Sequence, residues 1–174
     1  MMSKMRTSGY ALALAVFAID QLAKWLMTGP LALREVGQIV LLPIFAFSYT
    51  ENAGVSLGLL TADTATGRWL LVALTGAIAA GVAVWIVREA NRWDVLALGL
   101  VLGGALGNIT DRIRFGYVVD FLDLHFGDFR PFMVFNVADA AITAGVVLLL
   151  ARSLLLRDKP AKLAGDQSAS ETLH

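Results

Sequence analysis

The sequence contains no cysteine, which excludes disulfide bonds, a thiol nucleophile and thiolate metal sites. Charge is also scarce: 16% of the 174 residues are charged, against roughly 25% in a typical soluble domain. The 14 basic residues balance the 14 acidic ones, so the chain lacks the basic excess that nucleic-acid binding requires. We therefore expect no nucleic-acid partner.

The chain is instead rich in apolar residues, which make up 57% of it and give a mean hydropathy of +0.70. A soluble domain this small could not bury so much apolar surface, which indicates a lipid-facing exterior. A spanning helix needs roughly 17–25 residues. Four apolar segments fit this length, namely residues 10–27, 69–87, 95–111 and 137–156. The third of them fits only if the helix continues past Ile109. The sequence predicts an all-α membrane protein with four transmembrane helices, in a single domain over residues 1–156.

The basic residues are biased toward one side of these spans. Eight of the fourteen lie in short segments next to span ends, namely Lys4, Arg6, Arg88, Arg92, Arg152, Arg157, Lys159 and Lys162. Such a bias marks the cytoplasmic side of a membrane. We therefore expect both termini in the cytoplasm and the longer segments 28–68 and 110–136 on the outer side. The polar residues 157–174 predict a disordered cytoplasmic tail.

A cleavable signal peptide is the alternative for the first span. Lys4 and Arg6 precede an apolar run, and Ala13-Leu14-Ala15 resembles a cleavage site. Three further spans follow, and the helical pattern continues past this point, so an uncleaved first span is the simpler interpretation.

The two outer segments carry strand-like patterns. Phe45, Phe47 and Tyr49 alternate with smaller residues, and this period of two is typical of a strand. Val118, Val119 and Phe121 also favour β structure. We expect a small β-rich element on the outer membrane face, with an irregular loop as the alternative.

Two charged residues, Asp20 and Lys24, lie within the first predicted span. A charge at the centre of a spanning helix costs about 2.5–3.5 kcal/mol. Because they are four positions apart, these two side chains share a helix face and can pair inside the bundle. A structural ion pair and a direct contact with substrate both agree with this placement.

Small residues repeat along the third predicted span. Gly99, Gly103 and Gly107 have the spacing that lets a neighbouring helix approach closely, so we expect them to pack. The partner of this stripe is either another helix of the same chain or a second copy.

A polar stripe accompanies these glycines to the outer end of the same span, formed by Gly104, Asn108, Asp111 and Arg112. The planar guanidinium of Arg112 suits bidentate contact with a carbonyl group or a headgroup phosphate. For Asp111 the simplest expectation is that it neutralises Arg112.

Two aspartates near the outer ends of the spans are candidates for catalysis. Asp120 has apolar neighbours, which is unusual for a solvated acid, and Asp139 lies near the start of the fourth span, where a charge marks a functional site by default. Two adjacent carboxylates share one proton, so one can activate water while the other polarises a carbonyl. Asp123 and Asp128 compete with Asp120 for this role.

Four motifs follow one another along the chain. They are Asp20-Gln21 with Lys24, then Thr50-Glu51-Asn52-Ala53-Gly54, then Gly104-Ala105-Leu106-Gly107-Asn108-Ile109-Thr110-Asp111-Arg112 leading through Gly116 and Val118 to Asp120-Phe121, and finally Phe135-Asn136-Val137-Ala138-Asp139. In this order and at these span ends, they resemble lipoprotein signal peptidase (signal peptidase II), the bacterial enzyme family that matures lipoproteins. The resemblance covers about residues 16–150.

The resemblance implies a metal-independent aspartic endopeptidase without a cofactor, in the bacterial cytoplasmic (inner) membrane, with its active site near the outer face. Such enzymes remove the signal peptide from prolipoproteins just before a cysteine that carries a diacylglyceryl group, and they are inhibited by globomycin. The family's catalytic aspartates match Asp120 and Asp139. Its substrate-binding residues match Asn52, Gly54, Gly104, Asn108, Arg112 and Asn136, and its supporting residues match Asp20, Lys24 and Asp111.

We expect a monomer that meets its lipid-modified prolipoprotein substrates among membrane lipids. One departure from the family is visible, because members often carry an aromatic residue shortly after the asparagine–glycine motif, where this chain has Leu57. The departure concerns how that loop packs rather than the chemistry.

Three other functions can be weighed against the peptidase. A metal-dependent phospholipid-processing enzyme would hold Mg²⁺ through acids clustered on one face, whereas here the acids are scattered over a loop. A proton-coupled transporter would carry ionisable residues near mid-membrane and often an internal repeat. A non-catalytic membrane scaffold gives no reason for an acid at both Asp120 and Asp139.

Overall fold

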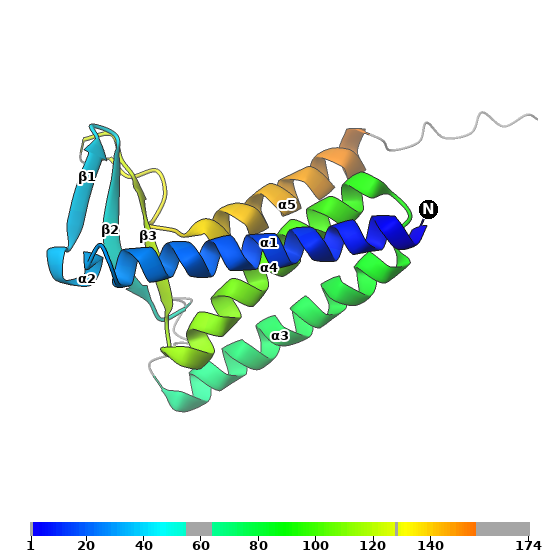
Figure 1. The fold of residues 1–174 in the computed structure, drawn as a ribbon, viewed down its shortest axis with the longest axis horizontal. Helices are drawn as coiled ribbons and strands as arrows, with labels where there is room; N and C mark the ends of the chain where they lie inside the picture. Colours follow the sequence, from blue (N-terminus) through cyan, green and yellow to red (C-terminus); the bar gives the residue numbers. More distant parts are fainter. Residues whose placement is uncertain (1, 55–63, 128, 156–174) are drawn as a thin grey trace, which may run out of the picture.

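Four long helices lie side by side in the computed structural model, and a small sheet crosses one end of the bundle (Figure 1). The structure describes residues 2–54, 64–127 and 129–155. The elements in chain order are α1 (Met2–Thr28), α2 (Leu33–Val36), β1 (Gln38–Leu42), β2 (Phe45–Asn52), α3 (Ala65–Arg88), α4 (Arg92–Arg114), β3 (Val118–Leu124) and α5 (Val137–Leu155).

The four long helices confirm the four predicted spans, because each is long and apolar enough to cross a membrane. Their bounds differ from the prediction chiefly at their N-terminal ends. Helix α1 begins at Met2 rather than at residue 10 and α3 at Ala65 rather than at residue 69. Helix α4 begins at Arg92 rather than at residue 95 and continues to Arg114. The side chain of Asn91 accepts a hydrogen bond from the Trp93 N–H and so starts this helix before its apolar run. Hydropathy detects only the apolar part of a helix that is polar at both ends.

Helix α4 is the centre of the bundle. Half of its apolar window is buried inside the protein, whereas the same share is 11–28% for the other three spans. Helices α1, α3 and α5 all pack on α4, and their remaining surface is apolar and exposed, as expected of helices that face lipid.

The glycines of α4 allow these close approaches. A methyl group added at Gly103 would overlap the carbonyl oxygen of Ala13 in α1, and Gly99 lies in the same way against Gly9. Gly107 lies against the side chain of Asp20. The prediction that this stripe packs against a helix is confirmed, and its partner is α1 of the same chain.

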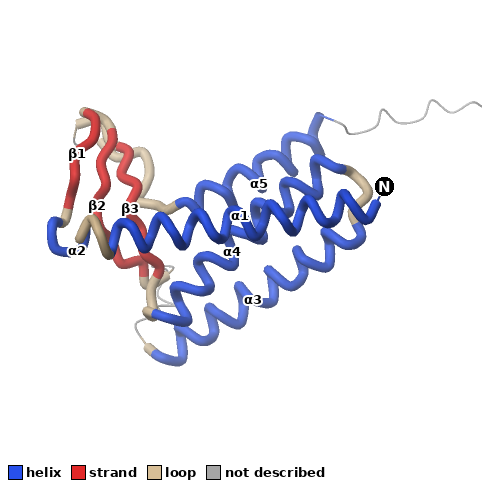
Figure 2. Tube along the Cα trace, in the orientation of Figure 1, coloured by secondary structure: helices blue, strands red, loops and turns tan. Residues whose placement is uncertain are grey.

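The sheet has three antiparallel strands in the order β1-β2-β3 (Figure 2). Strands β2 and β3 confirm the β-rich element predicted from the outer segments, whereas β1 and the short helix α2 were not predicted. The pairing of β2 with β3 sets Thr50 opposite Asp120 and Asn52 opposite Val118. This register brings the end of β2 beside the first candidate aspartate.

Three predictions concern residues outside the described part of the chain. They are the replacement of an aromatic residue by Leu57, the competing acid Asp128 and the disordered tail at 157–174.

Candidate active site

The two candidate aspartates reach one site from different elements. Asp120 lies on β3 with 1% of its surface exposed, and Asp139 lies in the first turn of α5. Asn108 approaches from α4 and Asn52 from the end of β2. The site therefore forms where the sheet meets the ends of α4 and α5.

The side chain of Asn136 joins the two aspartates. Its Nδ2 donates to Oδ1 of Asp120 at 2.6 Å, and its Oδ1 accepts from the backbone N–H of Asp139 at 2.9 Å. Oδ2 of Asp139 accepts in return from the backbone N–H of Asn136 at 3.3 Å. This reciprocal pair is a capping box, so the same contacts that begin α5 also orient both carboxylates.

Asn108 connects this pair to the helices. Its Nδ2 donates to Oδ1 of Asp139 at 2.7 Å, while its Oδ1 accepts from Nδ2 of Asn136 at 3.1 Å and from Nζ of Lys24 at 3.2 Å. Because Lys24 can only donate, it fixes which end of the Asn108 amide faces Asp139.

Asn52 holds the second oxygen of Asp120. Its Nδ2 donates to Oδ2 of Asp120 at 3.0 Å, and its Oδ1 accepts from the backbone N–H of Gly54. Gly54 has a φ of 109°, a conformation that residues with a side chain rarely adopt. The asparagine–glycine motif is thus a turn that orients the Asn52 amide toward the carboxylate of Asp120.

The pKa of Asp120 is raised to about 6, chiefly because burial disfavours its charged form. Hydrogen bonds from Asn52 and Asn136 partly oppose this shift, and the negative charge of Asp139 adds to it. Asp139 therefore acts on Asp120 electrostatically, in addition to the amide of Asn136 that contacts both residues.

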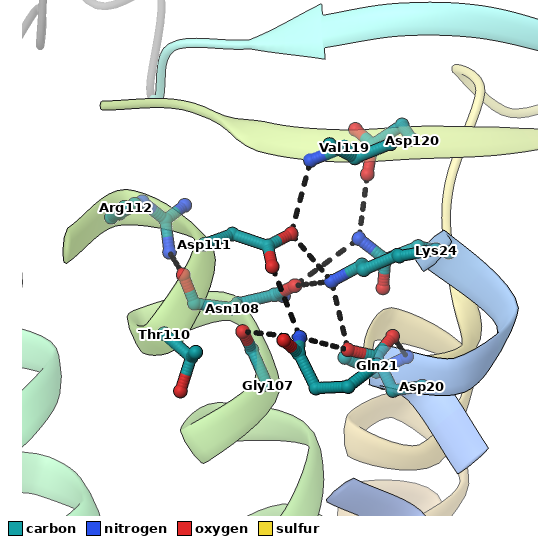
Figure 3. A network of polar contacts seen from close by, with 12 residues as sticks. Asp20, Gln21, Lys24, Gly107, Asn108, Thr110, Asp111, Arg112, Val119 and Asp120 are labelled. Atoms are coloured by element: carbon teal, nitrogen blue, oxygen red, sulfur yellow. Dashed lines mark hydrogen bonds and ion pairs between the residues drawn. The ribbon is translucent and has the colours of Figure 1, made fainter. Parts of the chain in front are cut away.

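A buried ion triad of Asp20, Lys24 and Asp111 lies below Asp120 in Figure 3. Nζ of Lys24 lies 2.9 Å from Oδ2 of Asp20 and 2.8 Å from Oδ2 of Asp111, and all three side chains are at most 5% exposed. The predicted pairing of Asp20 with Lys24 is confirmed. Gln21, which the sequence motif includes but to which we assigned no role, donates to both carboxylates.

The triad also fixes the two backbone segments that carry the aspartates. Oδ2 of Asp111 accepts from the N–H of Val119, the neighbour of Asp120. Oδ1 of Asp20 accepts from the N–H of Ala138, the neighbour of Asp139. One lysine therefore organises the acids that hold both catalytic candidates in place.

The expectation that Asp111 neutralises Arg112 is wrong. Asp111 pairs with Lys24, and no described carboxylate lies within ion-pair distance of Arg112. Consecutive residues on a helix point in directions about 100° apart, so Asp111 faces α1 while Arg112 does not. Among the described residues, the guanidinium of Arg112 makes only a long contact of 3.5 Å to the Asn108 carbonyl, and its Nε has no partner.

Two other predicted residues lie apart from this group. Gly104 packs against Ala138 and Ile142 of α5, so its place is a helix contact. The competing acid Asp123 bonds instead to Ser48 and Arg130. Burial raises the pKa of Asp123, but the hydrogen bonds from Arg130 and Ser48 outweigh it and lower the pKa overall.

Comparison with known proteins identifies the family of this chain. The family model described as Signal peptidase (SPase) II matches residues 12–155. The lipoprotein signal peptidase of Sphingopyxis alaskensis is 58% identical over 151 residues, which cover 87% of each chain. The chain belongs to the signal peptidase II family. Another member, from Rhizorhabdus wittichii, is 56% identical over 153 residues, which cover 88% of this chain and 89% of the relative.

Solved structures of membrane enzymes share this fold. Two structures of bacterial membrane enzymes superpose with a TM-score of 0.73 each, at 25% and 27% identity. They cover 93% and 88% of this chain, and this chain covers 95% of each of them. This signal peptidase II is thus a multi-pass membrane peptidase of the family that cleaves signal peptides from prolipoproteins.

The acids of this signal peptidase II are dispersed rather than gathered around one point. The described residues contain no group of three or more histidine, aspartate and glutamate side chains that could hold a metal ion. Asp20 and Asp111 pair with Lys24, and Asp123 pairs with Arg130, so basic side chains engage these acids.

Proposed function

We propose that this signal peptidase is an aspartic endopeptidase, with Asp120 and Asp139 as its catalytic residues. The observation that carries the proposal is the amide of Asn136, which contacts Asp120 through one end and the backbone of Asp139 through the other. Burial and the charge of Asp139 raise the pKa of Asp120 to about 6, well above that of a free aspartate, which supports Asp120 as the member of the pair that carries the proton more readily.

The reaction needs one carboxylate and one carboxylic acid. The carboxylate removes a proton from water, whose oxygen attacks the carbonyl carbon of the scissile peptide. The acid gives its proton to the carbonyl oxygen. When the tetrahedral intermediate collapses, the C–N bond breaks, the carboxyl that took the proton from water gives it to the leaving amine, and a hydroxyl of the intermediate returns its proton to the other carboxylate. The raised pKa of Asp120 favours the proton on Asp120, which makes Asp139 the base in the first step.

The substrate in this proposal is a prolipoprotein whose cysteine carries a diacylglyceryl group, cut just before that cysteine. The acyl chains stay in the bilayer while the peptide lies extended along the sheet, as in strand addition. Arg112 is suited to a carbonyl or an acyl-glyceryl oxygen, because its N–H groups are largely free among the described residues. Asn52, Gly54, Asn108 and Asn136 surround the carboxylates, where a bound peptide would pass.

The proposed location is the bacterial inner membrane, with the active site at the outer face and both termini in the cytoplasm. The N-terminus and the turn between α3 and α4 share one end of the bundle, and the sheet lies at the other (Figure 1). Lys4, Arg6, Arg88 and Arg92 lie at the first end, which supports its cytoplasmic placement. The glycine stripe of α4 is occupied by α1, which supports a monomer. We also propose inhibition by globomycin.

Mass spectrometry of the cleavage products tests the substrate. Purified enzyme is mixed with a prolipoprotein that either carries the diacylglyceryl group or has a free cysteine, with and without excess EDTA. We expect one cut, just before the lipidated cysteine, that EDTA leaves unchanged and globomycin blocks. Cleavage that EDTA abolishes, or equal cleavage of both substrates, would contradict the proposal.

A further inference from the structure

A second polar site lies at the end of the bundle opposite the aspartates. It is a groove with a volume of about 490 Å³ between the end of α3, the start of α4 and the end of α5. Its lining combines apolar and charged side chains, namely Trp85, Glu89, Asp94, Leu149, Leu150, Arg152 and Ser153. The catalytic proposal leaves this groove without a role.

The groove carries one net negative charge. Asp94 and Arg152 form an ion pair at 2.7 Å and neutralise each other. Glu89 is the remaining charge, and its carboxylate accepts from the N–H groups of Asn91 and Ala90 and from Nε1 of Trp85. These hydrogen bonds, that from Asn91 foremost, lower the pKa of Glu89 and keep it ionised. A fixed carboxylate beside an exposed tryptophan ring is complementary to a cation on an apolar chain.

An exposed face of α5 connects this groove with the active site. Asp139, Thr143, Val146, Leu150 and Ser153 are spaced four, three, four and three residues apart, so they share one face of the helix. The last four of these side chains are all exposed. Helices α3 and α5 both pack on α4 but, within the described residues, not on each other. The face is therefore open to another apolar helix that approaches through the membrane.

The length of this face matches a signal peptide. Fourteen positions separate Asp139 from Ser153, which is roughly 21 Å of helix. A signal peptide has a basic n-region, then an apolar h-region of about 7–15 residues, then its cleavage site. As a helix the h-region spans roughly 10–22 Å. A substrate that is cut at Asp139 and has an h-region near the upper end of this range therefore places its basic n-region at the level of Glu89.

We infer that the groove around Glu89 is a binding site for the basic n-region of the substrate's signal peptide, and that the face of α5 from Thr143 to Ser153 receives the apolar h-region. The inference rests on the proposed function, because it takes the cleavage site to lie at Asp120 and Asp139. It adds a specificity determinant that acts on KM and lies roughly 20 Å from the chemistry.

Charge-changing substitutions in both the enzyme and the substrate test the n-region site. Three lipidated prolipoproteins differ only in two n-region residues, which are Lys-Lys, Gln-Gln or Glu-Glu. For the unchanged enzyme we expect KM to be about 2- to 5-fold lower with Lys-Lys than with Gln-Gln, the range of an exposed ion pair, at equal kcat. Glu89→Gln should abolish this preference, since glutamine keeps the oxygen that caps the turn but loses the charge. Glu89→Lys should reverse it in favour of Glu-Glu.

Arg92→Gln is the matched control, because Arg92 is exposed at the same end of the bundle but does not line the groove. It should keep the preference for Lys-Lys. An n-region preference that is absent from the unchanged enzyme, or that Glu89→Lys fails to reverse, overturns the inference. Failure of the unchanged enzyme to cleave any of the three substrates would instead contradict the proposed function.

Photocrosslinking tests the face of α5 independently of kinetics. A photoreactive residue replaces Leu150 in the Asp139→Asn enzyme, which should hold the substrate uncut. We expect an adduct with the half of the h-region next to the n-region. Adducts with phospholipid alone would show that lipid, rather than the signal peptide, covers this face, and would overturn the inference.

Discussion

Nδ2 of Asn136 lies 2.6 Å from Oδ1 of Asp120, so a residue that begins a transmembrane helix holds a carboxylate on a strand. The same side chain accepts the N–H of Asp139 and thereby caps α5. The start of α5 and the position of Asp120 therefore depend on different atoms of one amide, its oxygen for the helix and its nitrogen for Asp120.

Substitution of Asn136 can separate these two contributions. Asn136→Ala should lower the free energy of unfolding by about 1 kcal/mol through loss of the cap, and should lower kcat by at least tenfold because Asp120 loses its donor. Asn136→Ser keeps a capping oxygen but has no group at the position of Nδ2. It should recover the part of the stability that the cap contributes without recovering kcat, as measured by unfolding in detergent and by cleavage rates. Recovery of both by serine would contradict the role given to Nδ2.

The titration of Asp120 should reveal its coupling to Asp139. Infrared or ¹³C NMR spectra of protein with labelled aspartate should give a midpoint near pH 6 for Asp120. Asp139→Asn should lower that midpoint because it removes a negative charge, and Asn52→Ala should raise it because it removes a hydrogen bond to the charged form. A midpoint near 4 that neither substitution moves would contradict the coupling.

The raised pKa of Asp120 also makes the stability of the folded protein depend on pH. The pKa of Asp120 in the folded protein lies above its unfolded value of 3.8, so the folded state binds the proton more tightly. The stability that Asp120 contributes is therefore complete below about pH 4 and is lost as pH rises through 6.

Loss of Lys24 should destabilise the protein far more than loss of a surface charge. Lys24→Met leaves the buried carboxylates of Asp20 and Asp111 without their cation, which should cost about 3–5 kcal/mol of unfolding free energy. Arg34→Met is the matched control, because Arg34 pairs with Glu51 in an exposed ion pair worth at most about 1 kcal/mol. Equal effects in detergent unfolding would mean that the triad does not hold α1 against α4.

The glycines of the bundle should differ in their tolerance of a methyl group. Gly103→Ala sets a methyl against the backbone of Ala13, so it should force α1 from α4 and cost about 1–3 kcal/mol or more. Gly76→Ala in α3 meets no atom within 4 Å and should be neutral or stabilising by up to about 1 kcal/mol. Thermal unfolding of the two variants distinguishes them, and similar losses would contradict close packing of α4.

Patterns along the chain were enough to predict the four spans, strands β2 and β3 and the glycine contact. Each has a local signal: an apolar run, a period of two, or small residues four apart. Strand β1 was missed because Gln38–Leu42 shows no clean alternation, and three of its five residues, Val40, Leu41 and Leu42, are exposed apolar side chains. The starts of α3 and α4 depend on capping by Thr64 and Asn91, which hydropathy does not register.

The sequence predicted which residues form the site better than it predicted which of them pair with one another. The sequence motifs contain Asp20, Lys24, Asp111 and Asn108, but the choice of Lys24 rather than Arg112 as the partner of Asp111 depends on which face of α4 meets α1. The contacts of Asp111 with Val119 and of Asp20 with Ala138 join residues through backbone N–H groups, which carry no sequence signal. Such contacts can be seen only once the helices are placed.

The most direct test of the aspartic mechanism compares cleavage of a lipidated prolipoprotein by the unchanged enzyme, Asp120→Asn and Asp139→Asn, all in excess EDTA. We expect cleavage by the unchanged enzyme and a loss of at least about 10³-fold in each variant, with both variants still folded and inserted. Cleavage that persists in either variant, or that EDTA abolishes in the unchanged enzyme, would contradict the aspartic mechanism.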